Sequence, residues 1–502
     1  MQKICTKLLL ILTLPVVSLC LPSIARAASE TSKPNVLLII ADDLNDWIGP
    51  MKGHPQVQTP HLDKLAARGM TFMNAQVSAP VCNPSRASFM SGQRPSTTGI
   101  YHNHQFVMPE IPRGVFINDY LRRFGYTSLG AGKIYHYKQY RSEDWDKVDY
   151  STDDTLPRHP ANRRPGPFGY RMFTEGKPAE PFNEQRDESE LVDYKSVSWC
   201  IEQLNEPRKN DNSFFMVCGI HRPHTPWDVP KKYFDLYPLE TLQLPQVLTN
   251  DLDDVPAAGL RFANRNVHAA LVKGGIWKDR VRAYLASVSY ADAQIGRLLD
   301  ALEKSKERDN TIVIFISDHD WHLGEKEHWA KSALWRQSTR IPMIWVAPGL
   351  TRPGTRCDRA VDVTSLYPTI CELTGTPVPK HAEGISIKPL LANPKAKWKQ
   401  PAIVTYLQNN HAIVTEDWRY IRYADGSEEL YNQKTDVNEW INVASKSEFA
   451  KVKKNLGKFL PKINAEPVAE RAEPDATPGR PARNKGKASV SGKKDPPPEG
   501  DL

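Results

Sequence analysis

Long apolar runs, internal repeats and segments that mix basic with aromatic residues are all missing from the main body of this 502-residue sequence. Beyond the N-terminus, no stretch reaches the roughly 20 apolar residues that a spanning helix needs, so no stable membrane insertion is expected. Without basic segments that carry aromatic residues, nucleic acid is not expected as a partner. The 40% hydrophobic and 25% charged content predicts a globular chain with one large and one small domain.

Cysteine is scarce, with seven residues in the whole chain. Cys5 and Cys20 lie in the N-terminal segment, and Cys82 belongs to a polar motif of its own. The remaining four are Cys200, Cys218, Cys357 and Cys371. In an exported protein these four could form two disulfides, but Cys218 and Cys371 follow apolar runs and fit plain buried thiols equally well.

The first 27 residues have the three parts of a secretory signal peptide. Lys3 and Lys7 precede an apolar stretch over residues 8–21, and Ala25-Arg26-Ala27 supplies the small residues of a cleavage site. We therefore expect cleavage after Ala27 and export to the periplasm or the extracellular space, or to a lysosome-type compartment in a eukaryote. The alternative is a retained anchor, for which the apolar stretch is short.

The net charge of +8 is modest for this length, and much of it lies near the C-terminus. Residues 466–502 mix Lys, Arg, Pro, Gly and Ser without apolar periodicity, which predicts a disordered, basic, Pro-rich tail. Such a tail is either a solvated appendage or a contact for polyanionic polysaccharide. Residues 141–190 are also polar and rich in Pro and Gly, as expected of surface excursions that wall a substrate cleft.

Four apolar runs end in polar clusters, which predicts buried strands with chemistry at their carboxyl ends. The runs and the clusters that follow them are residues 36–40 into Asp42-Asp43, 126–129 into Gly132-Lys133, 214–220 into His221, and 311–316 into Asp318-His319. Helical patterns lie between the runs, including residues 60–68 and 281–304. Alternating strands and helices predict an α/β domain over residues 34–397, with a mainly parallel sheet covered on both faces and a site at its carboxyl rim.

The pattern changes after this region. Residues 402–406, 411–414 and 418–423 are short strand-like runs, and Asp425-Gly426 is a turn signal. We expect residues 398–465 to form a small antiparallel α+β subdomain with a closing helix.

The segment that begins Cys82-Asn83-Pro84-Ser85-Arg86 predicts an anion site. Pro84 suits the first position of a helix and Gly92 suits its C-terminal cap, so Cys82 would lie beside the free N–H groups of a helix N-terminus. The alternative is an ordinary cysteine between a turn and a helix.

Carboxylates and an imidazole follow two of the predicted strands. Asp42 and Asp43 follow the first, and Asp318 and His319 follow the fourth. Such oxygen-rich ligands suit a hard divalent cation. The chemical rival is a zinc site that uses an unmodified Cys82 thiolate, but three hard carboxylates beside one soft ligand fit zinc poorly.

The other candidates for the rim are Lys133, His136, His221, Trp321 and Lys331. Lys133 and His136 are near enough in sequence to address the same anion, with the imidazole as a titratable base. His221 follows its strand directly, whereas we expect His224 to be structural or peripheral. Trp321 could flank a sugar ring or pack in the core.

In this order, these elements resemble the type I sulfatases of the alkaline phosphatase superfamily, from about Pro34 to Trp440. The Cys-x-Pro-Ser-Arg pattern at residues 82–86 is the most specific part of the resemblance, and residues 429–432 are similar to the family's C-terminal segment. His319 resembles the iduronate 2-sulfatase branch, because other sulfatases more often have asparagine there. The resemblance implies an alkaline phosphatase-like fold, with the sheet sandwiched by helices.

The resemblance also implies a nucleophile that the gene does not encode. A formylglycine-generating maturation enzyme would oxidise Cys82 to Cα-formylglycine, although Asn83 departs from the small residue that is commoner after the cysteine. The implied metal is Ca²⁺, with these ligands: Asp42, Asp43, Asp318, His319 and an oxygen of the modified Cys82. The implied catalytic residues are Cys82, Arg86, Lys133, His136, His221 and Lys331. The implied substrate-binding residues are Trp321, Lys331 and His221.

The implied reaction is hydrolysis of a sulfate ester in two stages. One hydroxyl of the formylglycine hydrate attacks sulfur while His221 or Lys331 assists the leaving sugar oxygen, and His136 then deprotonates the second hydroxyl so that sulfate is eliminated. The implied substrate is a sulfated carbohydrate, and the resemblance ties recognition of a uronate to Trp321 and Lys331. Two alternatives stay open: a phosphonate monoester or phosphodiester hydrolase of the same superfamily, and a non-catalytic secreted glycan-binding protein.

Overall fold

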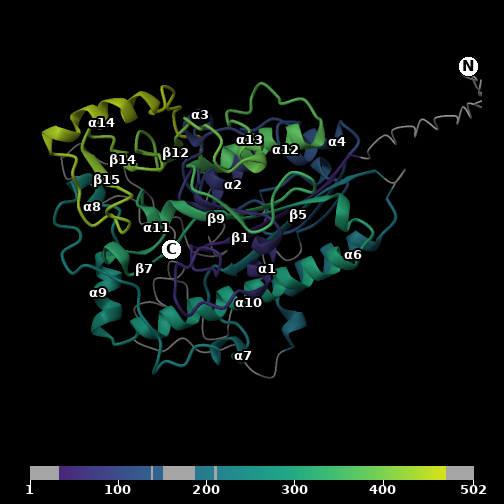
Figure 1. Ribbon diagram of the computed structural model, residues 1–502, viewed down its shortest axis with the longest axis horizontal. Coiled ribbons are helices and arrows are strands. Elements are labelled where there is room, and N and C mark those ends of the chain that lie inside the picture. Colours follow the sequence, from purple (N-terminus) through teal and green to yellow (C-terminus); the bar gives the residue numbers. More distant parts are fainter. Residues whose placement is uncertain (1–32, 137–138, 151–186, 209–211, 471–502) are drawn as a thin grey trace, which may run out of the picture. The chain divides into compact units, whose positions relative to one another are not determined.

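Figure 1 shows the computed structural model, which describes residues 33–136, 139–150, 187–208 and 212–470. The predicted signal peptide lies outside these residues, as do residues 151–186 of the predicted excursions and residues 471–502 of the predicted tail. Within the described part of the chain, no helix is long and apolar enough to cross a membrane.

The main sheet has nine strands and is mostly parallel. In spatial order, eight of them are β10 (Thr355–Cys357), β2 (Met70–Gln76), β9 (Arg340–Val346), β6 (Thr311–Ser317), β1 (Asn35–Asp42), β5 (Phe214–Pro223), β3 (Thr127–Gly132) and β4 (Lys147–Asp149), and β11 (Val361–Asp362) pairs with β2. β9 runs antiparallel to both of its neighbours, whereas the other pairings are parallel. The predicted mainly parallel sheet is confirmed.

The four strands predicted from the sequence are β1, β3, β5 and β6, and they lie side by side in the order β6-β1-β5-β3. Their continuous apolar runs have a physical reason, because successive side chains of a strand point to opposite faces and both faces are buried here. In β1, Val36 and Leu38 pack in one core, and Leu37 and Ile39 pack in the other.

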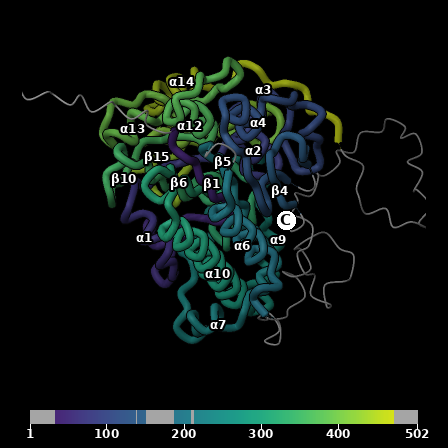
Figure 2. The backbone as a smooth tube through the Cα atoms, turned by 90° about the vertical axis from the view of Figure 1, so that its right-hand side faces the viewer, coloured from purple at the N-terminus to yellow at the C-terminus, as the bar shows by residue number. Residues whose placement is uncertain are grey.

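Helices cover both faces of the sheet, as Figures 1 and 2 show. One face is covered by α1 (Pro60–Arg68), α6 (Val192–Asn205) and α10 (Trp277–Lys304), and the other by α2 (Cys82–Ser91), α4 (Ile117–Arg122), α12 (Leu366–Thr374) and α13 (Lys388–Ala392). The shorter helices are α3 (Pro95–Thr98), α7 (Lys231–Phe234), α8 (Ala257–Leu260), α9 (Arg265–Lys273) and α11 (Arg336–Thr339). The predicted helix over residues 281–304 begins one turn earlier, at Trp277.

A second sheet follows the main one in sequence and is antiparallel throughout. Its strands are β12 (Ala402–Thr405), β13 (His411–Val414), β14 (Trp418–Arg422) and β15 (Glu428–Asn432), and α14 (Ala450–Leu456) follows. The three predicted strands and the closing helix are confirmed, but β15 was not predicted as a strand. The domain boundary between residues 397 and 398 stays a prediction.

The cysteines of the described residues are all free and buried. They are Cys82, Cys200, Cys218, Cys357 and Cys371. The structure therefore favours the buried-thiol alternative over the two disulfides that the sequence also allowed.

Candidate active site

The carboxyl ends of β6, β1, β5 and β3 meet at one rim of the main sheet. Asp42 ends β1 and Asp43 follows it, while Asp318 and His319 come directly after β6. Lys133 follows β3 in the same way. All of these side chains are buried, so the rim forms an internal polar site.

The backbones of β3 and β5 lie very close together where β3 ends and Lys133 begins. Gly132 has φ 74°, and a Cβ atom there would lie 2.1 Å from the carbonyl oxygen of Gly219. A Cβ atom on Gly219 would in turn lie 2.0 Å from the carbonyl oxygen of Lys133. Glycine is therefore required on both strands for Lys133 to reach its position.

Helix α2 brings Cys82 to the rim. The helix begins at Cys82, and Gly92 caps its C-terminus with φ 74°. Pro84 is thus its third residue and not its first, as the sequence predicted; proline is tolerated there because the first-turn N–H groups have no intrahelical partner. The Cys82 side chain is fully buried, with Sγ 3.1 Å from Nε2 of His319 and 3.6 Å from Oδ1 of Asp42.

The N-terminus of α2 is less open to an anion than the sequence predicted. The N–H of Asn83 donates to Oδ1 of Asn103 at 2.9 Å. The side-chain amide of Asn83 donates to the carbonyl oxygens of His102 and Gln105, at 3.0 Å each, and its Oδ1 accepts from Gln139 at 3.0 Å. The residue after the cysteine therefore ties α2 to a neighbouring loop, which explains an amide where the resemblance leads one to expect a small side chain.

Four predicted metal ligands converge on one point. One ligand atom each from Asp42, Asp43, Cys82 and His319 lie within 4.8 Å of one another. Asp318 borders this group, with Oδ2 3.6 Å from Nε2 of His319 and Oδ1 accepting from the N–H of Asp43 at 3.2 Å. Asp43 has φ 62°, a left-handed backbone conformation that is unfavourable for a residue with a Cβ atom and is often found at functional sites.

The donor set fits a hard divalent cation. Burial raises the pKa of Asp43 to about 7, and the neighbouring carboxylates Asp42 and Asp318 raise it further against the opposing effect of Lys331. The Oδ2 atom of Asp43 is buried without a hydrogen-bond partner among the described residues. Three carboxylates packed this closely repel one another, and a divalent cation with oxygen preference would remove that repulsion. The residues present therefore fit Ca²⁺, and they fit zinc less well.

Two buried lysines flank the cysteine. Nζ of Lys133 forms an ion pair with Asp42 and lies 3.9 Å from Sγ of Cys82. Nζ of Lys331 lies 2.9 Å from Oδ1 of Asp43 and 3.1 Å from the same sulfur. Burial alone would lower the pKa of each lysine, but Asp42 and Asp43 respectively raise it above its ordinary value, so both stay charged. Two fixed positive charges beside residue 82 would favour negative charge on a group held there.

Arg86 cross-links the strand ends. Its Nε donates to Oδ2 of Asp318 at 2.8 Å, its Nη1 donates to the carbonyl oxygen of Lys133, and its Nη2 lies 3.6 Å from Oδ1 of Asp42. The guanidinium is fully buried. It therefore braces the carboxylate cluster from behind residue 82.

The end of β5 and the turn after it carry two histidines, His221 and His224, toward the rim. The carboxylate of Asp193, in the first turn of α6, accepts from the N–H groups of His221 at 2.7 Å and Arg222 at 3.1 Å. His224, which was predicted to be structural or peripheral, has Nε2 3.8 Å from Oδ2 of Asp43. Its Nδ1 contacts the carbonyl oxygen of Thr225 at 2.6 Å; because a carbonyl only accepts, Nδ1 carries the proton and Nε2 presents a lone pair to the cluster.

His221 is also buried, and burial together with the charge of Lys133 lowers its pKa to about 3. Burial lowers the pKa of His224 as well. Both imidazoles are thus neutral at physiological pH. The only sequence signal for His224 was its place at the end of a predicted buried strand, three residues after His221.

The remaining two predicted residues, Trp321 and His136, are also buried. Trp321 is fully buried, packs edge-to-face against Trp227 at 6.1 Å between ring centroids, and has Nζ of Lys331 5.5 Å from its own ring centroid. It therefore packs beside Lys331 and shows no ring face to solvent. His136 is 5% exposed and lies three residues beyond Lys133.

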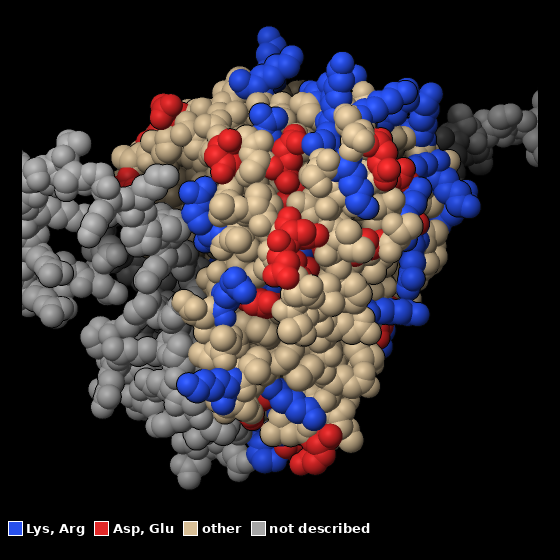
Figure 3. All heavy atoms as spheres, turned by 90° about the vertical axis from the view of Figure 1, so that its left-hand side faces the viewer, with Lys and Arg blue, Asp and Glu red and all other residues tan. Residues whose placement is uncertain are grey.

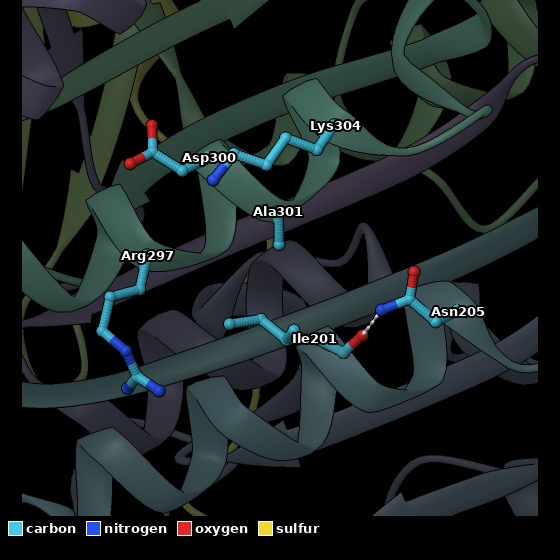
Figure 4. A pocket seen from close by; sticks show the side chains of 6 residues that line it. All are labelled: Ile201, Asn205, Arg297, Asp300, Ala301 and Lys304. Carbon is cyan, nitrogen blue, oxygen red and sulfur yellow. Dashed lines mark hydrogen bonds between the residues drawn. The ribbon is translucent and has the colours of Figure 1, made fainter.

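A separate surface hollow of about 440 Å³ lies between α6 and α10, away from the rim (Figure 4). Its lining residues are Ile201, Asn205, Arg297, Asp300, Ala301 and Lys304. The Arg297 guanidinium already donates to Tyr194, Gln294 and Ser198. The hollow contains no residue of the predicted site, and its Arg297 guanidinium already has hydrogen-bond partners on α6 and α10.

Known proteins share both the sequence and the fold. Residues 34–376 match the sulfatase family, and residues 324–466 match the C-terminal region of N-sulphoglucosamine sulphohydrolase. A sulfatase of Formosa agariphila is 36% identical over 467 residues, covering 88% of this chain and 89% of its own. Human iduronate 2-sulfatase is 32% identical over 410 residues, covering 73% of this chain and 74% of its own.

A solved structure with D-glucosamine-2-N,6-O-disulfate bound as substrate superposes with a TM-score of 0.67, at 20% identity, covering 86% of this chain and 97% of its own. The mainly parallel nine-strand sheet and the small antiparallel sheet form an alkaline phosphatase-like fold. The chain belongs to the sulfatase family. Membership implies a formylglycine and a metal site, and the buried group of Asp42, Asp43, Cys82 and His319 matches that requirement.

Proposed function

We propose that this chain hydrolyses sulfate esters of sulfated glycans, with a formylglycine derived from Cys82 as its nucleophile. One observation carries the proposal: Cys82 lies at the centre of a buried group of carboxylates, one imidazole and two lysines, with the lysine ammonium groups 3.1 and 3.9 Å from its sulfur. Fixed positive charge at this point suits a tetrahedral anion held against residue 82.

The unmodified thiol would be a poor nucleophile here. Burial raises the pKa of Cys82 to about 12, although Lys133 and Lys331 act in the opposite direction. The thiolate is the reactive form of cysteine, so an unmodified Cys82 would be inert at neutral pH. This favours Cys82 as a precursor and disfavours an unmodified cysteine nucleophile.

The proposed calcium ligands are Asp42, Asp43, Asp318, His319 and an oxygen of the modified residue 82. Bound Ca²⁺ would polarise the sulfate oxygens, and the hydrated formylglycine would supply the attacking hydroxyl. Arg86 would hold the carboxylate of Asp318 in place through the 2.8 Å contact from its Nε.

The remaining side chains would bind the sulfate and move protons. Lys133 and Lys331 would stabilise negative charge on its oxygens. His221 or Lys331 would assist the leaving sugar oxygen, whereas the unprotonated Nε2 of His224, 3.8 Å from Oδ2 of Asp43, has no proton to donate. His136 would take the proton whose loss releases sulfate.

A glycan substrate is supported by similarity to iduronate 2-sulfatase and by the aminosugar disulfate in the related solved structure. We propose a uronate-containing sulfated glycan, of the iduronate 2-sulfate type, as the first substrate to test. Lys451, Lys454 and Lys458 are exposed on and just after α14, and Lys and Arg gather along the top of the face in Figure 3. Such positive charge suits a polyanionic chain.

We further propose that residues 1–27 direct export and that a formylglycine-generating enzyme acts on the chain. The first experiment is mass spectrometry of the peptide that contains residue 82, from protein made in a host with that enzyme. A loss of about 18 Da relative to the thiol is expected, since conversion replaces CH₂SH by CHO. Unmodified cysteine throughout would overturn the proposed mechanism and favour a non-catalytic glycan-binding protein.

Reaction class is tested next with matched aryl esters. Rates on 4-nitrophenyl sulfate are expected to exceed those on the corresponding phosphonate monoester and phosphodiester, and Cys82→Ala should abolish all three while Cys200→Ala should abolish none. Faster turnover of a phosphorus ester would replace the sulfatase proposal with the phosphonate or phosphodiester alternative. Sulfated disaccharides with and without a uronate then test the sugar.

A further inference from the structure

The segment that carries Lys331 has an unusual backbone. Lys326 (φ 53°), Glu327 (φ 48°), Ala330 (φ 73°) and Ser332 (φ 77°) all lie in the left-handed region, although each has a Cβ atom. Single residues of this kind are unfavourable, and they persist only when the surrounding structure holds them. Four of them within seven residues mean that strong contacts must hold this segment in place.

Part of the restraint is local. β7 (His322–Leu323) and β8 (Trp329–Ala330) pair antiparallel and close the segment into a short hairpin. Nδ1 of His328 accepts from the N–H of Asn264 at 2.9 Å, and its Nε2 contacts the carbonyl oxygen of Lys331 at 2.9 Å. The N–H of Ser332 donates to the carbonyl oxygen of Pro80 at 3.1 Å, two residues before Cys82.

The other restraint is a buried cation at the far end of the hairpin. The Lys326 side chain is 1% exposed, and its Nζ lies 2.8 Å from Oδ1 of Asp251. Nζ also donates to the carbonyl oxygen of Glu439 and lies 5.0 Å from the ring centroid of Tyr431 and 5.7 Å from that of Trp335. Lys326 thus fastens the hairpin both to residue 251 and to the region of the second sheet.

A buried ion pair is weak evidence for a purely stabilising role, because desolvation offsets most of the attraction between its charges. Its geometric effect is more direct, since Lys326 and Lys331 belong to one short strained segment. At the other end of that segment, Nζ of Lys331 must lie within about 3 Å of residue 82 and of Asp43. A displacement of about 1 Å at a reacting centre can cost roughly 100-fold in rate.

We infer that Lys326 is a positioning residue, which holds the strained segment to Asp251 and Glu439 so that the Lys331 ammonium stays against residue 82. Lys326 makes no contact with the buried carboxylate cluster in the described residues, so it acts through Lys331 alone. The inference rests on the proposed function, because it assigns Lys331 a task in that reaction.

Lys326→Met tests the inference in formylglycine-bearing enzyme. The expected result is a fall in kcat of about 10- to 100-fold, with KM for 4-nitrophenyl sulfate changed less than about twofold. Because Asp251 would then be buried without its partner, the double variant Lys326→Met/Asp251→Asn is measured beside it. The double variant leaves no uncompensated charge, so it should fold and should still show the loss in kcat.

Lys453→Met is the matched control, since Lys453 pairs with Glu428 on the second sheet and makes no contact with the hairpin. It should leave kcat unchanged. In a Lys331→Met background, Lys326→Met should have no further effect on kcat, because residues that act as a unit are not additive. Full kcat in the double variant, or an additive loss in the Lys331→Met background, would overturn the inference.

Crystal structures separate this inference from the proposed function. In Lys326→Met, the distance from Nζ of Lys331 to the β-carbon of residue 82 is expected to increase. If the wild-type enzyme turned over no sulfate ester, the proposed function would fail while this measurement would still report the position of Lys331. If the wild-type enzyme were active and Lys331 did not move in the variant, the inference alone would fail.

Discussion

The rim of the main sheet and the small C-terminal sheet use buried charge in opposite ways. At the rim, strand ends present Asp42, Asp318 and Lys133 directly to the site, where their charges face one another around Cys82. Arg419, on β14 of the second sheet, and Glu439, which follows β15, are buried and contact the chain after Lys331. Strand ends, cross-linked by Arg86, position the first group, whereas the segment that leaves the sheet is held by contacts from the region of the second sheet.

The brace has a defined set of contacts. Arg419, on β14, pairs with Glu439 and donates to the carbonyl oxygen of Leu334 at 3.1 Å and to Oγ1 of Thr339 at 2.9 Å. Glu439 accepts from the N–H of Arg336 at 2.9 Å through its other oxygen. These contacts hold the chain from residue 334 to residue 339, directly after the Lys331 segment.

The largest effect is expected from Asp43→Asn, which changes the carboxylate group at the rim. Removing one carboxylate charge from the proposed calcium group should lower kcat/KM on 4-nitrophenyl sulfate by about 100- to 1000-fold, since charge stabilisation of the transition state is lost. Bound calcium, measured by elemental analysis, should fall in parallel. Asp235→Asn, at an exposed pair with Lys231, should change neither quantity; equal behaviour of the two variants would refute the assignment.

Arg419→Met tests the buried pair of Arg419 and Glu439 near the second sheet. It leaves Glu439 buried without its partner, so the free energy of unfolding should fall by about 3 to 5 kcal/mol in urea titrations. Arg422→Met, on the same strand, removes only a 4.0 Å pair between half-exposed Arg422 and Glu428. That control should cost less than about 1 kcal/mol. Similar losses for the two variants would contradict a special role for the buried pair.

His328 should make the Lys331 segment sensitive to acid. Burial lowers the pKa of His328 to about 4, whereas an unfolded histidine titrates near about 6.5. Between these values the unfolded chain binds the extra proton and the folded chain does not, so stability falls as the pH decreases from 6.5 to 4, by roughly 3 kcal/mol.

The measurement is the free energy of unfolding from urea titrations at pH 7, 5.5 and 4. His328→Gln should flatten this dependence relative to the wild type, whereas His104→Gln, at an exposed residue, should leave it unchanged. An identical pH slope in wild type and His328→Gln would show that this imidazole does not carry the effect.

Gln105→Ala tests the loop that contacts Asn83, the residue after Cys82. The buried Gln105 amide donates to the carbonyl oxygens of Gly99 at 3.1 Å and Val468 at 3.0 Å, and so joins the loop beside Asn83 to the last described residues of the chain. Leaving these partners unsatisfied should cost roughly 1 to 3 kcal/mol in the free energy of unfolding. Gln246→Ala, at an exposed residue, should leave the free energy of unfolding unchanged.

Much of the fold could be predicted from the sequence because the signals are local. Apolar runs over residues 36–40, 214–220 and 311–316 are long enough for buried strands, and each ends at a polar cluster. The order of those strands then brings the clusters to one rim. β15 escaped prediction because Glu428 and Glu429 interrupt its apolar pattern, and only the structure shows Glu429 buried against Trp335 and Tyr431.

Parts of the site could not be predicted because they depend on contacts between residues far apart in the sequence. The position of His224 depends on how Asp193, which lies 31 residues earlier in the chain, holds the end of β5 through the N–H groups of His221 and Arg222. The burial of Trp321 depends on Trp227 and Lys331, from different segments. The start of α2 at Cys82 depends on partners for its first N–H groups, one of which is Asn103.

By itself, the sequence determined the alternation of strands and helices, the motif at residues 82–86 and the acids that end β1 and β6, because each is a property of a few consecutive residues. The tertiary structure alone decided which charges meet. It brought Lys326 to Asp251 and Glu439, placed Lys331 and Lys133 on either side of Cys82, and turned His224 inward. These contacts join residues far apart in the chain. Their free energy depends on burial and distance, which no local sequence pattern encodes.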